Sequence, residues 1–256
     1  MERRKPIIVK LGGALITYKD KPLAINLGVI NNIGGALSKS DSPLILVHGG
    51  GSFGHYFAEK YSLTTKPSRA SAVGVSRTRI AMLKLNLKIM DRLHNHGIDP
   101  YPLPPSCFVG LTKKSKRDLF LSLMDQGLTP ITYGDVLMKK RDCYILSGDE
   151  ITRILSDALR PKRVIFLLNV DGIFWSLSQS NSPIEELKPE DLREVQLQSV
   201  GMDVTGGMAL KLKEALRIAR MGIDVIFVNG KDPRRIFKAL IGEPSKGTLI
   251  RGMISD

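Results

Sequence analysis

The segment HGGGSFGH at residues 48–55 carries the densest concentration of residues that can do chemistry. It follows the apolar run 44–47, which is typical of a buried strand. Because glycine has no Cβ, three consecutive glycines let backbone N–H groups approach a ligand closely. A concave set of N–H groups is a good site for phosphate. The segment therefore predicts an anion-binding turn.

A second glycine pair, Gly12 and Gly13, follows the apolar run 6–9 and Lys10. Two strands that end in glycine near the N-terminus predict one shared site. The sequence has no G-x-x-x-x-G-K-S/T loop, and no G-x-G-x-x-G between a strand and a helix. Neither a P-loop nor a simple dinucleotide fold is therefore supported, and the phosphate site must be built in another way.

These residues must be positioned by a framework in which apolar strand-like runs alternate with helix-like patterns. That alternation predicts an α/β fold, a three-layer αβα sandwich with a mostly parallel central sheet. Apolar spacing predicts strands at 6–11, 43–48, 129–133, 163–169 and 224–228 and helices at 26–39, 70–96, 149–159, 206–221 and 233–241. The stretch 98–147, rich in proline and short basic turns, can hold hairpins. A turn near residue 148 divides the chain into two lobes, 1–147 and 148–256, without a linker.

Composition narrows the class of protein. With 256 residues, 43% of them hydrophobic, the chain can bury one large core or two packed lobes. Cys107 and Cys143 are too few for a disulfide framework or a four-thiolate zinc site, which favours a reducing compartment. The first apolar stretch stops at Lys10, too short for a signal peptide, and no segment approaches the ~20 apolar residues of a membrane span. We expect a soluble cytoplasmic protein with no membrane partner.

The net charge of +13 raises the possibility of nucleic-acid binding. The short basic runs at 3–5, 113–117 and 139–141 contain none of the interleaved aromatic residues on which bases stack. No zinc-finger or RNP pattern is present either. We therefore interpret the runs as solvated surface and expect no nucleic-acid partner. An excess of positive charge can also steer polyanionic substrates toward a cleft.

Ordered blocks along almost the whole chain resemble the amino acid kinase family. The blocks are VKLGGALITYK at 9–19, LVHGGGSFGH at 46–55, LSGDEITRILSDAL at 146–159, FLLNVDGIF at 166–174, VTGGMALKLKEAL at 204–216, VNGKDP at 228–233 and GTLI at 247–250. Within the family, His55 at the end of its block and Lys19 after LITY resemble the isopentenyl phosphate kinases.

The resemblance implies direct in-line transfer of a phosphoryl group from ATP, with Mg²⁺, to isopentenyl phosphate. The product would be isopentenyl diphosphate, an isoprenoid precursor of the alternative mevalonate route. The resemblance also implies that 1–147 bind the acceptor, that 148–256 bind ATP, and that the protein is a homodimer. One alternative is another kinase of the family, acting on a phosphonate, a carboxylate or a nucleoside monophosphate. The other is a nucleotide-sensing or nucleic-acid-binding protein that has lost catalysis.

Three lysines are candidates for neutralising the phosphate charge that phosphoryl transfer must stabilise. The resemblance places Lys10 at the ATP phosphates and Lys19 nearest to the transferred phosphoryl group. Lys211 lies one helical turn after a glycine pair and can face the same phosphates as the helix N-terminus. The alternatives are a lysine ending an edge strand for Lys10, a loop lysine for Lys19, and a solvated helix lysine for Lys211.

Glycines beside these lysines complete the nucleotide side of the predicted site. Gly12 and Gly13 would present amides to the ATP phosphates, and Gly51 and Gly207 are assigned to the nucleotide as well.

His55 carries the prediction about the acceptor. A monophosphate with a second pKa near ~6 is mostly dianionic at neutral pH, so its nucleophilic oxygen needs no general base. His55 can instead donate a hydrogen bond to an acceptor oxygen and hold it in line, while the Gly50 and Gly51 amides complete the cradle. His48 directly follows the strand, and we interpret it as structural.

Two aspartates have a role by resemblance and a simpler alternative. Asp149 would orient the lysines, with Gly148 beside the substrate, but a position at a helix start is also typical of an N-cap. Asp171, in NVDG, resembles a position that contacts the nucleotide, but Asp-Gly is also a common turn. The sequence offers no dense carboxylate cage, so we expect no protein metal site and Mg²⁺ held mainly by ATP oxygens and water.

The predicted helix 70–96 is the candidate wall for the apolar tail of the acceptor. Its candidate residues are Met82, Leu83, Ile89, Met90 and Leu93. Core packing is the common alternative for such residues.

Overall fold

The computed structural model describes residues 4–174, 182–187 and 206–253. Its main sheet has eight strands in the order β3-β4-β2-β1-β7-β9-β10-β8. The strands are β1 (Ile7–Leu11), β2 (Leu44–His48), β3 (Pro100–Pro102), β4 (Thr129–Tyr133), β7 (Arg163–Leu168), β8 (Glu186–Leu187), β9 (Val225–Asn229) and β10 (Gly247–Ile250). The six strands from β3 to β9 in this order are parallel, whereas β10 runs antiparallel to β9.

The topology identifies one edge of the sheet as the place for a site. Parallel strands bring their carboxyl ends to the same edge. The chain passes from β1 outward to β2, and later from β7 outward to β9 on the other side. Such a reversal opens a crevice outside the carboxyl ends of the two central strands, which here are β1 and β7. Lys10 lies on β1, one residue from that end.

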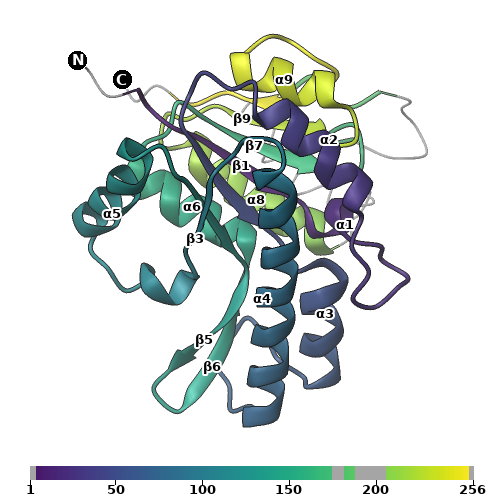
Figure 1. Cartoon of the computed structure of the whole chain (residues 1–256), viewed down its shortest axis with the longest axis vertical. Helices are drawn as coiled ribbons and strands as arrows, with labels where there is room; N and C mark the ends of the chain where they lie inside the picture. The colour runs from purple at the N-terminus through teal and green to yellow at the C-terminus, as the bar shows by residue number, and fades with distance from the viewer. Residues whose placement is uncertain (1–3, 175–181, 188–205, 254–256) are drawn as a thin grey trace.

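Helices cover both faces of the sheet and confirm the three-layer sandwich (Figure 1). One face carries α2 (Leu27–Leu37), α4 (Ala72–His94) and α9 (Pro233–Ile241). The other carries α5 (Lys113–Asp125), α6 (Gly148–Leu159) and α8 (Gly206–Ala219). Among the described residues, no helix is long and apolar enough to cross a bilayer.

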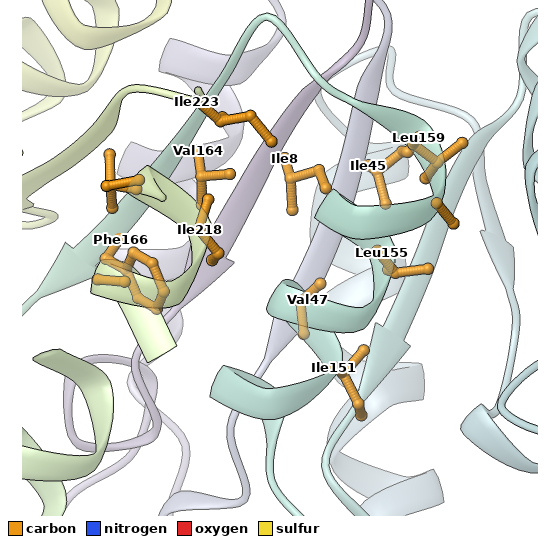
Figure 2. Packing of buried hydrophobic residues seen from close by; sticks show 14 of the residues in the cluster. Ile8, Ile45, Val47, Ile151, Leu155, Leu159, Val164, Phe166, Ile218 and Ile223 are labelled. Atoms are coloured by element: carbon orange, nitrogen blue, oxygen red, sulfur yellow. The ribbon is translucent and has the colours of Figure 1, made fainter. Parts of the chain in front are cut away.

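The alternation of side chains along β1 decides which way Lys10 points. Ile7 and Val9 pack in the core on the α2 and α4 side, and Ile8 packs in the core on the α6 and α8 side. Figure 2 shows Ile8 beside residues of α6 such as Leu155. Because side chains alternate between faces with a period of two, Lys10 points to the same side as Ile8. Lys10 therefore enters the layer of α6 and α8.

A projecting part of the molecule is built from α3 (Gly51–Lys60), the first half of α4, and the hairpin of β5 (Asp135–Lys139) and β6 (Asp142–Leu146) (Figure 1). A third apolar cluster, with Ala58, Leu63, Val136 and Cys143 at its centre, joins these elements. The hairpin confirms the prediction of hairpins in 98–147.

The five predicted strands and five predicted helices are all present, with ends shifted by at most two residues. Two longer helices were missed, α3 and α5. The start of α3 is glycine-rich, which disfavours a helix, and Gly51 enters it with a φ of +48° that glycine tolerates. The basic run at 113–117 was interpreted as surface only, although Thr112 caps α5 there. Short elements also went unpredicted: α1 (Gly13–Ile16), a 3-10 turn at Pro105–Cys107, and the strands β3, β8 and β10 of the main sheet.

Candidate active site

The two glycine turns are in direct backbone contact. β1 and β2 are neighbours, with Leu11 opposite His48, so the turns that follow them start side by side. A Cβ added to Gly13 would lie 2.8 Å from the Cα of Gly51, and one added to Gly49 would lie 3.0 Å from the Gly13 nitrogen. Glycine is needed on both sides because the two backbones leave no room for a side chain.

Each turn keeps two amide N–H groups without a partner among the described residues. The Gly12 amide donates to the Leu167 carbonyl, and the Gly49 amide donates to the Leu11 carbonyl, each at 3.0 Å. This leaves the amides of Gly13 and Ala14 in the first turn and of Gly50 and Gly51 in the second. The prediction that the Gly12 amide faces phosphate was wrong, since that N–H is used within the sheet, and Ala14 takes its place as a free donor.

Beside the turns, one carboxylate lies between two lysines. Lys10 Nζ is 2.6 Å from Asp149 Oδ1, and Lys211 Nζ is 3.3 Å from Asp149 Oδ2. The Lys10 side chain is 3% exposed and the Asp149 side chain 10%. Oδ1 accepts no well-directed hydrogen bond from the described residues, so its contact with Lys10 is an ion pair. We call these three residues the lysine–aspartate cluster.

Burial and mutual charge shift the pKa values in this cluster. Burial lowers the pKa of Lys10, and Lys211 lowers it further, while Asp149 acts in the opposite direction. Burial alone would raise the pKa of Asp149, but the two lysines outweigh it and hold that pKa below its usual range. Asp149 is thus an anion flanked by two amines, and the cluster has an excess of positive charge suited to a phosphate ligand.

Local structure explains why Asp149 faces the lysines. Ser147 caps α6, since its hydroxyl accepts a hydrogen bond from the Glu150 amide at 3.1 Å. The N-cap alternative for Asp149 was therefore wrong. A Cβ on Gly148 would lie 3.0 Å from the His48 carbonyl oxygen and 3.5 Å from Lys10 Cε. Glycine at 148 lets the start of α6 pack directly on β1 and β2.

A salt bridge that the sequence did not predict joins α6 to α8. Arg153 Nε donates to Glu214 Oε2 at 2.6 Å, and Glu214 is buried. Arg153 is four residues after Asp149, and Glu214 is three residues after Lys211, so both share a helix face with a member of the cluster. This spacing was the available signal. The bridge holds the helix of Asp149 against the helix of Lys211.

The two histidines of HGGGSFGH differ as predicted in their surroundings. His48 is fully buried, its Nε2 lies 3.1 Å from Asn86 Oδ1, and its ring stacks on Tyr133. Burial lowers the pKa of His48 to about 4, so it is neutral, as a structural histidine would be. His55, on α3, is exposed to solvent, but partial desolvation and then the charges of Lys211 and Lys10 lower its pKa.

Other predicted site residues lie outside the lysine–aspartate cluster. Lys19 is exposed on a turn, and no hydrogen bond or ion pair within the described chain links it to the cluster. Gly207 accepts a hydrogen bond from Lys211 Nζ at 3.3 Å, and a Cβ added to it would meet open space. Residues 204 and 205, the start of the VTGGMALKLKEAL block, lie outside the described residues.

Asp171 belongs to a second network. It receives hydrogen bonds from Lys246 at 2.8 Å, Asn229 at 3.0 Å and Arg235 at 2.6 Å. These bonds, that of Lys246 first, hold the pKa of Asp171 below its usual range. We call this group the Asp171 network.

The predicted apolar wall is only partly next to the glycine turns. Met82 Sδ would lie 3.4 Å from a Cβ on Gly50. Ile89 and Leu93 are completely buried in the core, Met90 packs against the same core, and Leu83 is 51% exposed. For these four the alternative of core packing or solvent exposure holds, because the helix turns them away from the glycine turns. Met82 is the member that adjoins the site.

No group of three histidine, cysteine, aspartate or glutamate side chains able to hold a metal ion occurs among the described residues. The carboxylate oxygens of Asp149 are already engaged by lysines.

Known proteins are similar to this chain over most of its length. A model described as the Amino acid kinase family matches residues 5–229. The isopentenyl phosphate kinase of Methanothermobacter thermautotrophicus is 33% identical, with 96% of this chain and 99% of the relative covered. That of Thermoplasma acidophilum is 32% identical, with 96% and 100% covered.

Solved structures agree with the fold as well. The product complex of the T. acidophilum isopentenyl phosphate kinase superposes with a TM-score of 0.79 at 28% identity, covering 96% of this chain and 99% of that chain. An isopentenyl phosphate kinase substrate complex gives the same TM-score and identity, with 96% and 100% covered.

Proposed function

This chain belongs to the amino acid kinase family, and from that premise we propose that it transfers the γ-phosphoryl group of ATP to isopentenyl phosphate. The products are isopentenyl diphosphate and ADP. The observation that carries the proposal is the lysine–aspartate cluster beside two joined glycine turns. This arrangement has two sets of free amides for two phosphate groups, with cationic charge next to both.

On the acceptor side, the site needs to position an oxygen that is already anionic. Isopentenyl phosphate is mostly dianionic near neutral pH, because its second pKa is about 6. The amides of Gly50 and Gly51 hold its phosphate, and Gly148, which packs on His48 just before that turn, borders the substrate. The pKa of His55 is lowered by partial desolvation and by the charges of Lys211 and Lys10, and its ring donates one N–H to an acceptor oxygen. Holding that oxygen in line with the transferred group is the main contribution to the rate.

On the donor side, lysines and amides neutralise charge on the ATP phosphates. Lys10 and Lys211 contact them, with Gly13 and the helix start at Gly207 supplying backbone groups. Asp149 holds both lysine side chains in place. Lys19, free of contacts with the cluster in this structure, reaches the transferred phosphoryl group with its long side chain.

Remaining nucleotide contacts and the metal complete the proposal. Gly12 and Gly51 allow close backbone approach, and Asp171 borders the nucleotide. Mg²⁺ would be held chiefly by phosphate oxygens and water, and when bound it would supply further neutralisation of phosphate charge. The residues present fit this, since the lysine–aspartate cluster offers cations to phosphate and no carboxylate cage to a metal.

We also propose which part of the chain binds each substrate and where in the cell the reaction takes place. Residues 1–147 bind the acceptor and 148–256 bind most of ATP, with Lys10 and the Gly12–Gly13 turn of the first part reaching the ATP phosphates, since one sheet runs through both parts. The reaction belongs to isoprenoid precursor synthesis by the alternative mevalonate route, in the cytoplasm. The protein's net positive charge favours capture of two anionic substrates.

The test is a coupled ADP-release assay with isopentenyl phosphate, dimethylallyl phosphate, fosfomycin, UMP, acetylglutamate and glutamate as acceptors. We expect the highest kcat/KM with isopentenyl phosphate. A preference for fosfomycin, UMP or either amino acid would reject the substrate while leaving the family assignment intact.

A homodimer is proposed on the family resemblance, and α4 offers a surface for it. Val73, Ile80, Leu83 and Leu87 are each more than 40% exposed, and their spacing of seven, three and four residues places them on one stripe of the helix. A second copy of the same stripe would cover these apolar side chains. Sedimentation of the wild type and of Leu83→Lys/Leu87→Lys tests this: a dimer that becomes a folded monomer is expected, and an unchanged mass would exclude α4 as the interface.

A further inference from the structure

Thr17 lies at the point where the two glycine turns meet. It follows α1 directly and is 3% exposed. Its hydroxyl donates a hydrogen bond to the Gly13 carbonyl at 2.8 Å and accepts one from the Ser52 amide at 2.9 Å. One side-chain oxygen therefore connects the first glycine turn to the start of α3.

The fit around this hydroxyl is close. A Cβ added to Gly51 would collide with Thr17 Oγ1 and would lie 2.7 Å from the Gly13 carbonyl oxygen. Gly51 also has a φ of +48°, a conformation in which other residues are strained. The position of Gly51 is thus determined by contact with Thr17 on one side and with Gly13 on the other.

The hydrogen bond to Ser52 also decides which amides remain for a ligand. The first N–H groups of a helix have no partner within the helix, so Ser52 would otherwise present a third free donor at the start of α3. Thr17 satisfies that donor. The Gly50 and Gly51 amides remain available, and their direction is set by a contact that originates in the other turn.

We propose that Thr17 is a positioning residue for phosphoryl transfer, which fixes the acceptor turn (Gly49–Gly51) relative to the donor turn (Gly12–Ala14). The inference rests on the proposed function, because it concerns the alignment of two phosphate groups. In-line transfer depends strongly on this alignment, and a displacement of about 1 Å can lower a rate by about 10²-fold. Thr17 acts through the backbone of Gly13 and Ser52 and contacts neither substrate.

The experiment compares Thr17→Val, Thr17→Ser and Thr132→Val by steady-state kinetics, with ATP affinity measured by calorimetry. Valine has the shape of threonine without the hydroxyl, so we expect kcat to fall by about 30- to 100-fold and the KM for isopentenyl phosphate to rise several-fold. ATP affinity is expected to stay within about threefold, since the lysine–aspartate cluster is untouched and the Thr17 amide still donates to the Gly13 carbonyl at 3.1 Å. Serine restores the hydroxyl, and kcat is expected within about threefold of the wild type.

Thr132 on β4 is the matched control. It is fully buried near the same edge of the sheet, but its hydroxyl has no hydrogen-bond partner among the described residues. Thr132→Val therefore removes the same atom from another buried threonine without removing a hydrogen bond, and unchanged kinetics are expected.

A second comparison separates positioning from simple folding. If Thr17 acts through α3, Thr17→Val should cost less in a His55→Ala background than in the wild type, because both changes damage the same acceptor alignment. Three results would overturn the inference: a Thr17→Val enzyme with wild-type kcat, equal losses in the Val and Ser variants, or losses that add fully to those of His55→Ala.

The failure of the proposed function would look different. The wild-type enzyme would then be inactive toward isopentenyl phosphate but active toward another acceptor. The same variants measured with that acceptor would still support or overturn the role of Thr17.

Discussion

Two aspartates near the carboxyl edge of the sheet are each held by two cationic side chains, in different surroundings. In the lysine–aspartate cluster, Asp149 and Lys10 are almost inaccessible to solvent. In the Asp171 network, Asp171 is 24% exposed, its partner Lys246 is 48% exposed, and Asn229 adds a further hydrogen bond. The same arrangement of charges is thus found once in the protein interior and once near water.

The difference shows how burial changes the meaning of an ion pair. Lysines near water lose little when a carboxylate is removed, because solvent replaces it. A buried lysine that loses its carboxylate partner has no solvent to replace it, so its charged form is destabilised and its pKa falls. The lysine–aspartate cluster is therefore sensitive to any added or removed charge, including that of a bound phosphate, whereas the Asp171 network mainly joins the ends of β7 and β9 to α9.

Asp149→Asn is expected to give the largest effect. It leaves Lys10 buried without an anion, so we expect turnover to fall by about 10³-fold and the free energy of unfolding to drop by about 3 kcal/mol. Steady-state kinetics and urea unfolding measure the two quantities. A variant with a stable fold and near wild-type turnover would show that burial does not distinguish the two networks.

His55→Ala tests the acceptor side next to the same cluster. We expect turnover with isopentenyl phosphate to fall by about 10²-fold, because one hydrogen bond to the reacting group is lost. ATP binding should persist, since His55 lies on the acceptor turn's helix. Calorimetric titration with ATP provides the control. Kinetics close to those of the wild type would exclude His55 from the reaction.

Asp171→Asn is expected to have a smaller effect, no more than about 1 kcal/mol of stability and a few-fold in turnover. The pKa of Asp171 is lowered in the folded protein, so its contribution is present above the unfolded pKa of about 3.9 and is lost as the pH falls through the lower folded value. The stability difference between wild type and variant should therefore be constant from pH 5 to 7 and shrink below pH 4. Urea unfolding across that range measures it, and a difference that grows in acid would contradict the assignment.

The smallest expected effect is a change in the pKa of His55, caused by the positive charge of the lysine–aspartate cluster. The charge of Lys211 contributes to lowering the pKa of His55, so Lys211→Met should raise that pKa toward 6.5. Lys246→Met, in the Asp171 network, should leave it unchanged. NMR titration of the His55 ring measures both. Equal shifts in the two variants would mean that the two networks act on the acceptor turn alike.

Much of the framework could be predicted from the sequence because it depends on local patterns. Apolar runs ending in glycine predicted β1 and β2 and their turns, and helical spacing predicted α4 and α6. The helix α3 could not be predicted in the same way, since it begins at a glycine whose left-handed backbone conformation is set by contact with the other turn. The alternative that Lys10 ends an edge strand was wrong, because β1 lies between β2 and β7 in the sheet. Strand order of this kind is not encoded in any single apolar run.

The site residues show the same difference between what a local pattern predicts and what a tertiary contact decides. Lys10, Asp149 and Lys211 were selected by resemblance to a family, and nothing in their spacing predicted their contact. Thr17, Ala14 and the Arg153–Glu214 bridge were missed. A threonine or alanine carries no pattern that distinguishes a site residue from a core residue.

By itself, the sequence determined the class of fold, the position of both glycine turns and the family, because these follow from patterns over a few residues or from ordered blocks. Only the tertiary structure decided which amides are free, which lysines share Asp149, and that one hydroxyl joins the two turns. Those features arise between residues far apart in the chain, where strand order, register and helix packing set distances to within an ångström. Hydrogen bonds and ion pairs depend on such distances, and a linear pattern does not contain them.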